Sequence, residues 1–149
     1  MRLRREITVE SLNARGAGRL PGLMGLQVLR LDERELHVRL PIRDELLAPN
    51  GFLHAASVIA LADTACGYAC AAHLPDGAEN FTTVELKTNF LGTATAGAIE
   101  TVARAVHLGR TTQVWDAVVT EAGSEGRAGK TIALFRCTQM ILWPRPERT

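Results

Sequence analysis

The feature that most constrains the fold is an apolar segment, rich in alanine, that runs from His54 to His73. It ends at Leu74-Pro75-Asp76-Gly77, where proline breaks the helical hydrogen-bond ladder and glycine permits a turn. Apolar residues cover nearly every face of the predicted helix, so other parts of the protein must surround it. Asp63 interrupts the segment and would make membrane insertion costly. We therefore expect a buried core helix and no membrane span.

Segments typical of strands lie on both sides of this helix. Leu26–Leu31 and Glu35–Leu40 read as a hairpin, and the second run alternates apolar with polar residues, which predicts one solvated face. Four later segments are rich in β-branched and aromatic residues and are separated by turn residues. They are Thr82–Leu91, Ile99–His107, Thr111–Glu121 and Lys130–Trp143. This order predicts an α+β fold in which a long antiparallel sheet curls around one helix.

Length and composition narrow the class of protein. The 149 residues suffice for one core, and we assign the whole chain, 1–149, to a single domain. The formal charge is +1 with scattered basic residues, so we expect no nucleic-acid binding. The three cysteines lack Cys-x-x-Cys spacing, which predicts buried side chains without a disulfide or metal site. The N-terminus lacks the apolar run of a signal peptide, which predicts a cytoplasmic protein.

Asp63 is the clearest candidate for chemistry. The residues one helical turn away on either side, Ile59, Ala60, Cys66 and Gly67, offer its carboxylate no charge partner. Burial without a partner raises the pKa of a carboxyl group and makes the carboxylate a useful base near neutral pH. A cation or backbone donor from the sheet would instead make Asp63 a structural residue, and the sequence leaves both interpretations open.

The start of the helix is the second candidate. After Asn50-Gly51-Phe52-Leu53-His54, the backbone N–H groups of Ala55 and Ala56 lie among the unpaired donors of the first turn and could stabilise an oxyanion. Alternatively, Asn50 or His54 merely caps the helix. Asp63 follows His54 by nine residues, or about 13 Å along one helix. Because that is too far for one compact site, we expect a site at the interface between two copies of the chain.

These residues resemble the hotdog-fold acyl-CoA thioesterases, especially the branch of the phenylacetyl-CoA and 4-hydroxybenzoyl-CoA thioesterases. The resemblance covers most of the chain and rests on Asn50–Ala56, Leu61–Ala65, Thr82–Leu91 and the strand order. The nine-residue step from His54 to Asp63 is the spacing of that family. The resemblance implies a cytoplasmic enzyme that hydrolyses an acyl-CoA or aryl-CoA thioester to a carboxylate and free coenzyme A, without a metal or redox cofactor.

The resemblance also implies roles for individual residues. Asp63 would act as general base toward water or as a nucleophile through a mixed anhydride, and both routes stay open. The amide N–H of Ala55 would polarise the thioester carbonyl, and His54 would shape the helix start. Thr83 would position water or the carboxylate, and Asn50 would be the polar partner from the loop.

By the same resemblance, the coenzyme A arm lies across the interface of a homodimer or homotetramer, with its phosphates near basic residues. Arg110 is the stronger candidate and Lys87 the weaker one, because a solvated surface charge is the better explanation of Lys87. Apolar residues near the presumed pocket, such as Phe52, Tyr68 and Phe90, suit an aromatic or medium-length acyl group.

Two features depart from the family pattern. The usual His-Gly-Gly is His54-Ala55-Ala56 here, which keeps both N–H donors but adds methyl groups beside them. The loop amide of many members stands six residues before the histidine, where this chain has Ala48, whereas Asn50 stands four before it.

Two other functions compete with the thioesterase interpretation. One is a non-catalytic acyl-CoA binding protein of the same fold, which would have no need for a costly carboxylate such as Asp63. The other is a hotdog dehydratase, whose histidine and carboxylate are arranged differently from His54 and Asp63.

Overall fold

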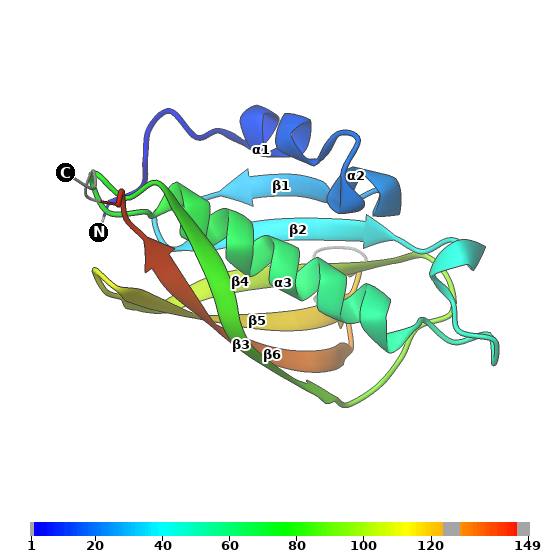
Figure 1. The fold of residues 1–149 in the computed structure, drawn as a ribbon. Coiled ribbons are helices and arrows are strands. Elements are labelled where there is room, and N and C mark those ends of the chain that lie inside the picture. Colours follow the sequence, from blue (N-terminus) through cyan, green and yellow to red (C-terminus); the bar gives the residue numbers. More distant parts are fainter. Residues whose placement is uncertain (1, 124–128, 146–149) are drawn as a thin grey trace.

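One six-stranded antiparallel sheet curls around a single long helix in the computed structural model, which describes residues 2–123 and 129–145 (Figure 1). The strands are β1 (Gln27–Leu31), β2 (Glu35–Pro41), β3 (Asn80–Phe90), β4 (Ala98–Leu108), β5 (Thr112–Glu121) and β6 (Thr131–Leu142). Their order across the sheet is β1-β2-β4-β5-β6-β3. The central helix, α3 (Ala55–Ala72), packs against β2 to β6. The predicted α+β architecture is confirmed, with element ends within two residues of the expected positions.

The core helix is apolar because it is enclosed. Leu61, Ala65 and Cys66 have no exposed surface, and small residues let the sheet come close. A Cβ atom added to Gly67 would lie 3.3 Å from Cζ of Phe81 on β3, so α3 and β3 almost touch there. By length and hydropathy α3 could cross a membrane. Its packing inside the sheet makes it a core helix instead.

The strands bury alternate side chains against α3. On β2, Leu36, Val38 and Leu40 are buried while the residues between them are partly exposed. Trp115 on β5 is fully buried, and its ring contacts the ring of His73 just beyond α3, with centroids 5.3 Å apart. The expected solvated face of the β1–β2 hairpin is therefore confirmed on the side of the sheet that faces away from α3.

Short helices precede and follow the β1–β2 hairpin along the chain. Near the N-terminus lies α1 (Val9–Gly16), with Thr8 as its N-cap in a capping box. The sequence reading missed α2 (Leu20–Met24), which has a proline in its first turn, and a 3-10 turn at Asp44–Leu46. Both are too short to produce a hydrophobic period.

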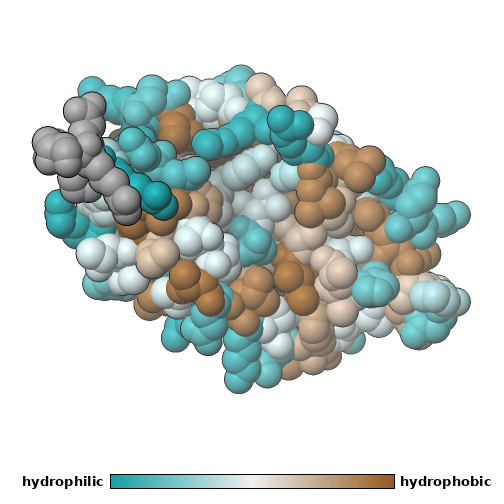
Figure 2. Space-filling view, in the orientation of Figure 1, coloured by the Kyte–Doolittle hydropathy of each residue, from teal (hydrophilic) through white to brown (hydrophobic). Residues whose placement is uncertain are grey.

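β3 forms an open edge of the sheet and, within the described part of the chain, pairs only with β6. A bulge lies at Val84, between the pairs made by Thr83 and Glu85. Several large apolar side chains of β3 stay exposed, including Val84 at 55%, Leu86 at 40% and Phe90 at 47%. Figure 2 shows apolar side chains gathered on the face where α3 and β3 lie in Figure 1. An unpaired edge beside apolar surface is the usual place for a further strand to add.

The enclosure of α3 predicts which leucines stabilise the fold. We expect Leu61→Ala, at a site with no exposed surface, to lower the free energy of unfolding by about 3 kcal/mol, because it leaves a cavity. Leu23→Ala on α2, where the side chain is 72% exposed, should change it by about 0.5 kcal/mol or less. Urea unfolding followed by circular dichroism compares the two variants. Equal effects would contradict a core centred on α3.

Candidate active site

Asp63 lies in the middle of α3, on the side that faces β3, and its side chain is half-buried. Its Oδ1 atom is shielded from solvent and has no hydrogen-bond partner among the described residues. Burial raises the pKa of the Asp63 carboxyl above its usual value, and a hydrogen bond with Thr83 opposes part of that rise. The expected lack of a charge partner is therefore confirmed within the described part of the chain.

Thr83 is the polar neighbour of Asp63. The β3–β6 register places it opposite Gln139, with both side chains on the α3 side of the sheet. The Thr83 hydroxyl lies 3.0 Å from Oε1 of Gln139, and the Gln139 amide in turn lies 3.3 Å from Sγ of Cys137. Gln139 is fully buried, so it holds Thr83 in place beside the carboxylate. Sequence reasoning missed Gln139, although a polar residue at a buried register position was the available signal.

The helix start offers one open donor where two were expected. The Nδ1 atom of His54 accepts the N–H of Ala56 at 2.9 Å, which makes His54 the N-cap of α3. The expectation that the Ala56 N–H is unpaired was therefore wrong, because the imidazole ring folds back over the first turn. Among the described residues, nothing accepts the Ala55 N–H. That N–H points out of the exposed first turn with the positive end of the helix dipole behind it.

The Asn50 side chain makes its hydrogen bond within its own loop. Its Oδ1 accepts the N–H of Phe52 at 3.3 Å, and the intervening Gly51 has a φ of +83°, a conformation that favours glycine. The loop is also closed by a bond from the Ala48 N–H to the Phe52 carbonyl at 2.7 Å. The structure does not bring Asn50 to Asp63 within one protomer.

The donor and the carboxylate are separated along one rigid helix. Ala55 precedes Asp63 by eight residues, which corresponds to about 12 Å of helix. A thioester carbonyl spans a few ångströms, so one protomer cannot place both groups on it.

The two candidate phosphate-binding residues lie apart from Asp63. The Arg110 guanidinium, in the β4–β5 turn, stacks 4.3 Å from the ring centroid of Trp143, and the indole N–H donates to the Arg110 carbonyl. Lys87 pairs with Arg136 in the β3–β6 ladder, on the outer face of the sheet. That face is opposite the one on which Thr83 meets Asp63.

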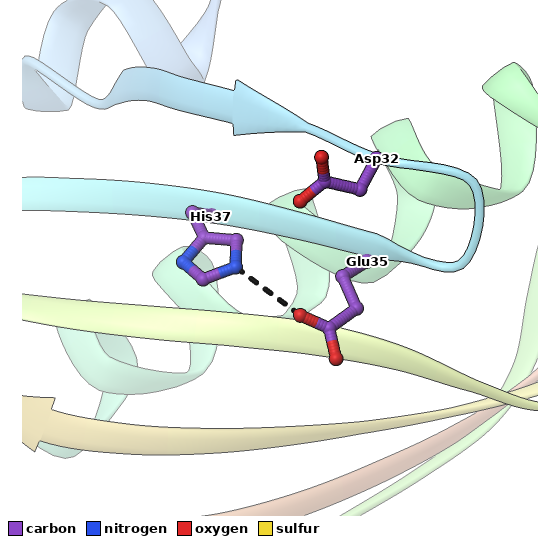
Figure 3. Close-up of side chains that lie close together, drawn as sticks. All are labelled: Asp32, Glu35 and His37. Carbon is purple, nitrogen blue, oxygen red and sulfur yellow. Dashed lines mark hydrogen bonds and ion pairs between the residues drawn. The ribbon is translucent and has the colours of Figure 1, made fainter.

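A second cluster of polar groups, formed by Asp32, Glu35 and His37, occupies the outer side of the β1–β2 hairpin (Figure 3). Two guanidinium groups already neutralise it. Arg30 contacts Asp32 at 2.7 Å, and Arg104 contacts Glu35 at 2.7 Å, which lowers the pKa of the Glu35 carboxyl. These cations compete with any metal ion, so we assign no metal ligands here.

The cysteines behave as buried apolar side chains, as expected. Cys66, Cys70 and Cys137 are all free and buried between α3 and β6. Burial raises the pKa of the Cys66 thiol and raises that of Cys70 to about 12. Thiols that stay protonated at neutral pH are poor nucleophiles.

Comparison with known proteins identifies relatives over nearly the whole chain. A family model described as the thioesterase superfamily matches residues 50–137. The 1,4-dihydroxy-2-naphthoyl-CoA hydrolase of Escherichia coli (strain K12) is 29% identical over 142 residues, covering 93% of this chain and 98% of that protein. The proofreading thioesterase EntH of Cronobacter turicensis is 29% identical over 116 residues, covering 78% and 84%.

Solved structures show the same fold. A mutant thioesterase from Pseudomonas aeruginosa superposes with a TM-score of 0.84 at 28% identity, covering 94% of this chain and 97% of that one. A thioesterase family protein from Silicibacter pomeroyi gives 0.78 at 29% identity, covering 89% and 96%. A thioesterase from Haemophilus influenzae gives 0.88 at 21% identity over the full length of both chains, and that likeness concerns the fold.

The unpartnered carboxylate predicts a stability change with a definite pH dependence. Because the pKa of Asp63 is raised in the folded state, the folded protein loses stability as the pH rises from the usual aspartate pKa through this raised pKa, and the loss is complete above it. We expect Asp63→Asn to raise the free energy of unfolding by about 1 kcal/mol at pH 7. The gain should disappear below the usual aspartate pKa, where the carboxyl is protonated in both states.

Denaturant unfolding at pH 7 and in the acid range measures this change. Asp76→Asn, in the exposed turn after α3, is the matched control and should show no comparable gain. Loss of stability in Asp63→Asn at pH 7 would mean that the carboxylate has a structural partner.

Proposed function

The chain belongs to the thioesterase superfamily and is a thioester hydrolase of the hotdog fold, and from this premise we propose that it hydrolyses acyl-coenzyme A thioesters in sites shared by two protomers. The separation of Asp63 from the open Ala55 N–H on one rigid helix carries this proposal. Relatives named as a CoA hydrolase and a proofreading thioesterase support an acyl-CoA substrate. The products are the free carboxylate and coenzyme A.

The partner in this proposal is a second copy of the chain. A two-fold axis beside Ile59, midway between Ala55 and Asp63, sets two α3 helices antiparallel and completes two equivalent sites. The open edge of β3, with exposed Leu86 and Phe90, supplies apolar surface for the same contact. We propose a homodimer as the catalytic unit and, by resemblance, its further pairing into a homotetramer.

The reaction needs three groups around the thioester carbonyl. Asp63, held by Thr83, takes a proton from water as the water oxygen bonds to the carbonyl carbon. The Ala55 N–H of the other protomer stabilises the negative charge that develops on the carbonyl oxygen. When the oxyanion collapses, the carbon–sulfur bond breaks, and the coenzyme A thiolate leaves and takes up the proton. We propose no metal or redox cofactor, because this step requires neither.

The remaining expectations belong to the same proposal. Arg110, exposed on its turn, is the better candidate for a coenzyme A phosphate, and Lys87 would require the arm to reach the outer face of the sheet. Asn50 shapes the loop before the N-cap His54. We place the enzyme in the cytoplasm, where acyl-CoA thioesters are made.

The central test is release of free coenzyme A thiol from a panel of aryl-CoA and acyl-CoA thioesters. We expect Asp63→Asn to reduce kcat by about 10³-fold or more without loss of fold, because the amide cannot accept the proton. In the unmodified protein, kcat/KM should fall as the pH drops through the raised pKa of Asp63. Full activity in a folded Asp63→Asn variant would contradict the proposal.

Light scattering on the same samples gives the oligomeric state. Binding of acyl-CoA without turnover by the unmodified protein would favour a non-catalytic acyl-CoA binding protein.

Single-turnover hydrolysis in ¹⁸O-labelled water separates the two chemical roles of Asp63. We expect label in the carboxylate product of the first turnover, because water attacks the thioester directly when Asp63 is a base. An unlabelled first product, with label in the peptide that contains Asp63, would instead mean a mixed anhydride. Mass spectrometry of the product and of a protease digest of the protein shows which of the two carries the label.

A further inference from the structure

Thr88 carries a second unsatisfied polar atom on the α3 side of the sheet. It pairs with Phe135 in the β3–β6 ladder, and Phe135 is buried, so Thr88 faces the helix. Its Oγ1 atom is shielded from solvent and has no hydrogen-bond partner among the described residues. Among buried side-chain polar atoms in that part of the chain, only Oδ1 of Asp63 shares this condition. A buried hydroxyl without a partner is costly, which calls for a functional explanation.

Two contacts fix how β3 lies along α3. Gly67 meets Phe81, and four residues earlier on the helix Asp63 meets Thr83. Four helical residues rise about 6 Å, and two strand residues rise about 6.6 Å. The helix and the strand therefore run in opposite directions past each other over this stretch.

The same spacing carries Thr88 from Thr83 toward the helix start. Because of the bulge at Val84, the helix-facing residues that follow Thr83 are Leu86 and Thr88, opposite buried positions of β6. Thr88 is thus four ladder positions beyond Thr83, or about 13 Å. Ala55 lies a matching distance before Asp63, about 12 Å along α3. Thr88 and the open Ala55 N–H therefore lie at matching distances from the Thr83–Asp63 contact, both in the direction of the helix start.

We propose that the Thr88 hydroxyl is a second hydrogen-bond donor to the thioester carbonyl oxygen, beside the Ala55 N–H and opposite the partner's Asp63. The inference rests on the proposed function, because the two-fold axis that brings Ala55 to the partner's Asp63 brings Thr88 with it. It also adds a donor at a helix start that has few. The Ala56 N–H donates to His54, so the Ala55 N–H is the one backbone donor left open there among the described residues.

Thr88 transfers no proton in this role. As water adds to the carbonyl carbon, the carbonyl oxygen gains negative charge, and the O–H of Thr88 and the N–H of Ala55 both donate to it. The carbonyl reforms when the carbon–sulfur bond breaks, and the thiolate takes up the proton held by the partner's Asp63. Donors aimed at developing charge act mainly on the transition state.

The first experiment replaces Thr88 by an isosteric residue. We expect Thr88→Val to lower kcat by about 100-fold with little change in KM, and Thr88→Ser to keep most of the activity because it keeps the hydroxyl. Unfolding of Thr88→Val should require at least as much urea as the unmodified protein, because the substitution removes an unsatisfied group. Thr82→Val, on the exposed outer face of the same strand, is the matched control and should retain full activity.

The result that overturns the proposal is a Thr88→Val enzyme within threefold of the unmodified protein. If Asp63→Asn is inactive in the same assays, the proposed function stands and only the role of Thr88 fails. If Asp63→Asn is active, the proposed function itself fails.

A second experiment tests whether Thr88 acts on the site of the other protomer. Asp63→Asn and Thr88→Val chains with different affinity tags are co-expressed, and heterodimers are isolated by sequential purification. One site of each heterodimer then combines an intact Asp63 with an intact Thr88 of the other chain, so about half the wild-type activity should return. If the two residues act within one chain, both sites are damaged and no recovery follows, which overturns this arrangement.

Discussion

The structure depends on the enclosure of one apolar helix by one curled sheet. A single sheet cannot close completely around α3, because β3 ends the sheet as an unpaired edge. The stripe of α3 that is left beside this edge carries Asp63, and the sheet provides it with no cation among the described residues. The raised pKa of this carboxyl is therefore a consequence of the architecture, and in the proposed function substrate and a second chain enter at the same gap.

A straight helix also separates the groups of the proposed mechanism. In that proposal the N-terminus of α3 supplies the backbone donor and its middle supplies the carboxylate, and no rotation of side chains can bring Ala55 and Asp63 together. The proposed two-fold symmetry would do so, because an antiparallel pair of helices produces two complete sites from two incomplete ones. In this arrangement the rigidity of α3 sets the geometry, and the loops before it have only to fix the N-cap.

Much of the fold could be predicted from the sequence, because its strongest patterns extend over many residues. The apolar length of α3 and the alternation in β2 predicted the fold, and the isolation of Asp63 in an apolar helix predicted its raised pKa. Features that depend on the direction of a single side chain could not be predicted from the sequence. The ring of His54 takes the Ala56 N–H, and Gln139 supports Thr83 from a strand 56 residues away in sequence. Short elements such as α2 contain too few residues to show a hydrophobic period in the sequence.

The bulge at Val84 has a consequence for how this sequence tolerates length changes. It is a single extra residue that sets which alternate residues of β3 face the helix beyond Thr83. If Val84 were instead paired in a regular ladder, Glu85, Lys87 and Asn89 would turn inward in place of Leu86 and Thr88, and charged groups would lie against the apolar helix. Deletion of Val84 would leave the facing of every later residue unchanged. At this position, loss of a residue is therefore less disruptive to the strand than closure of the bulge with the residue retained.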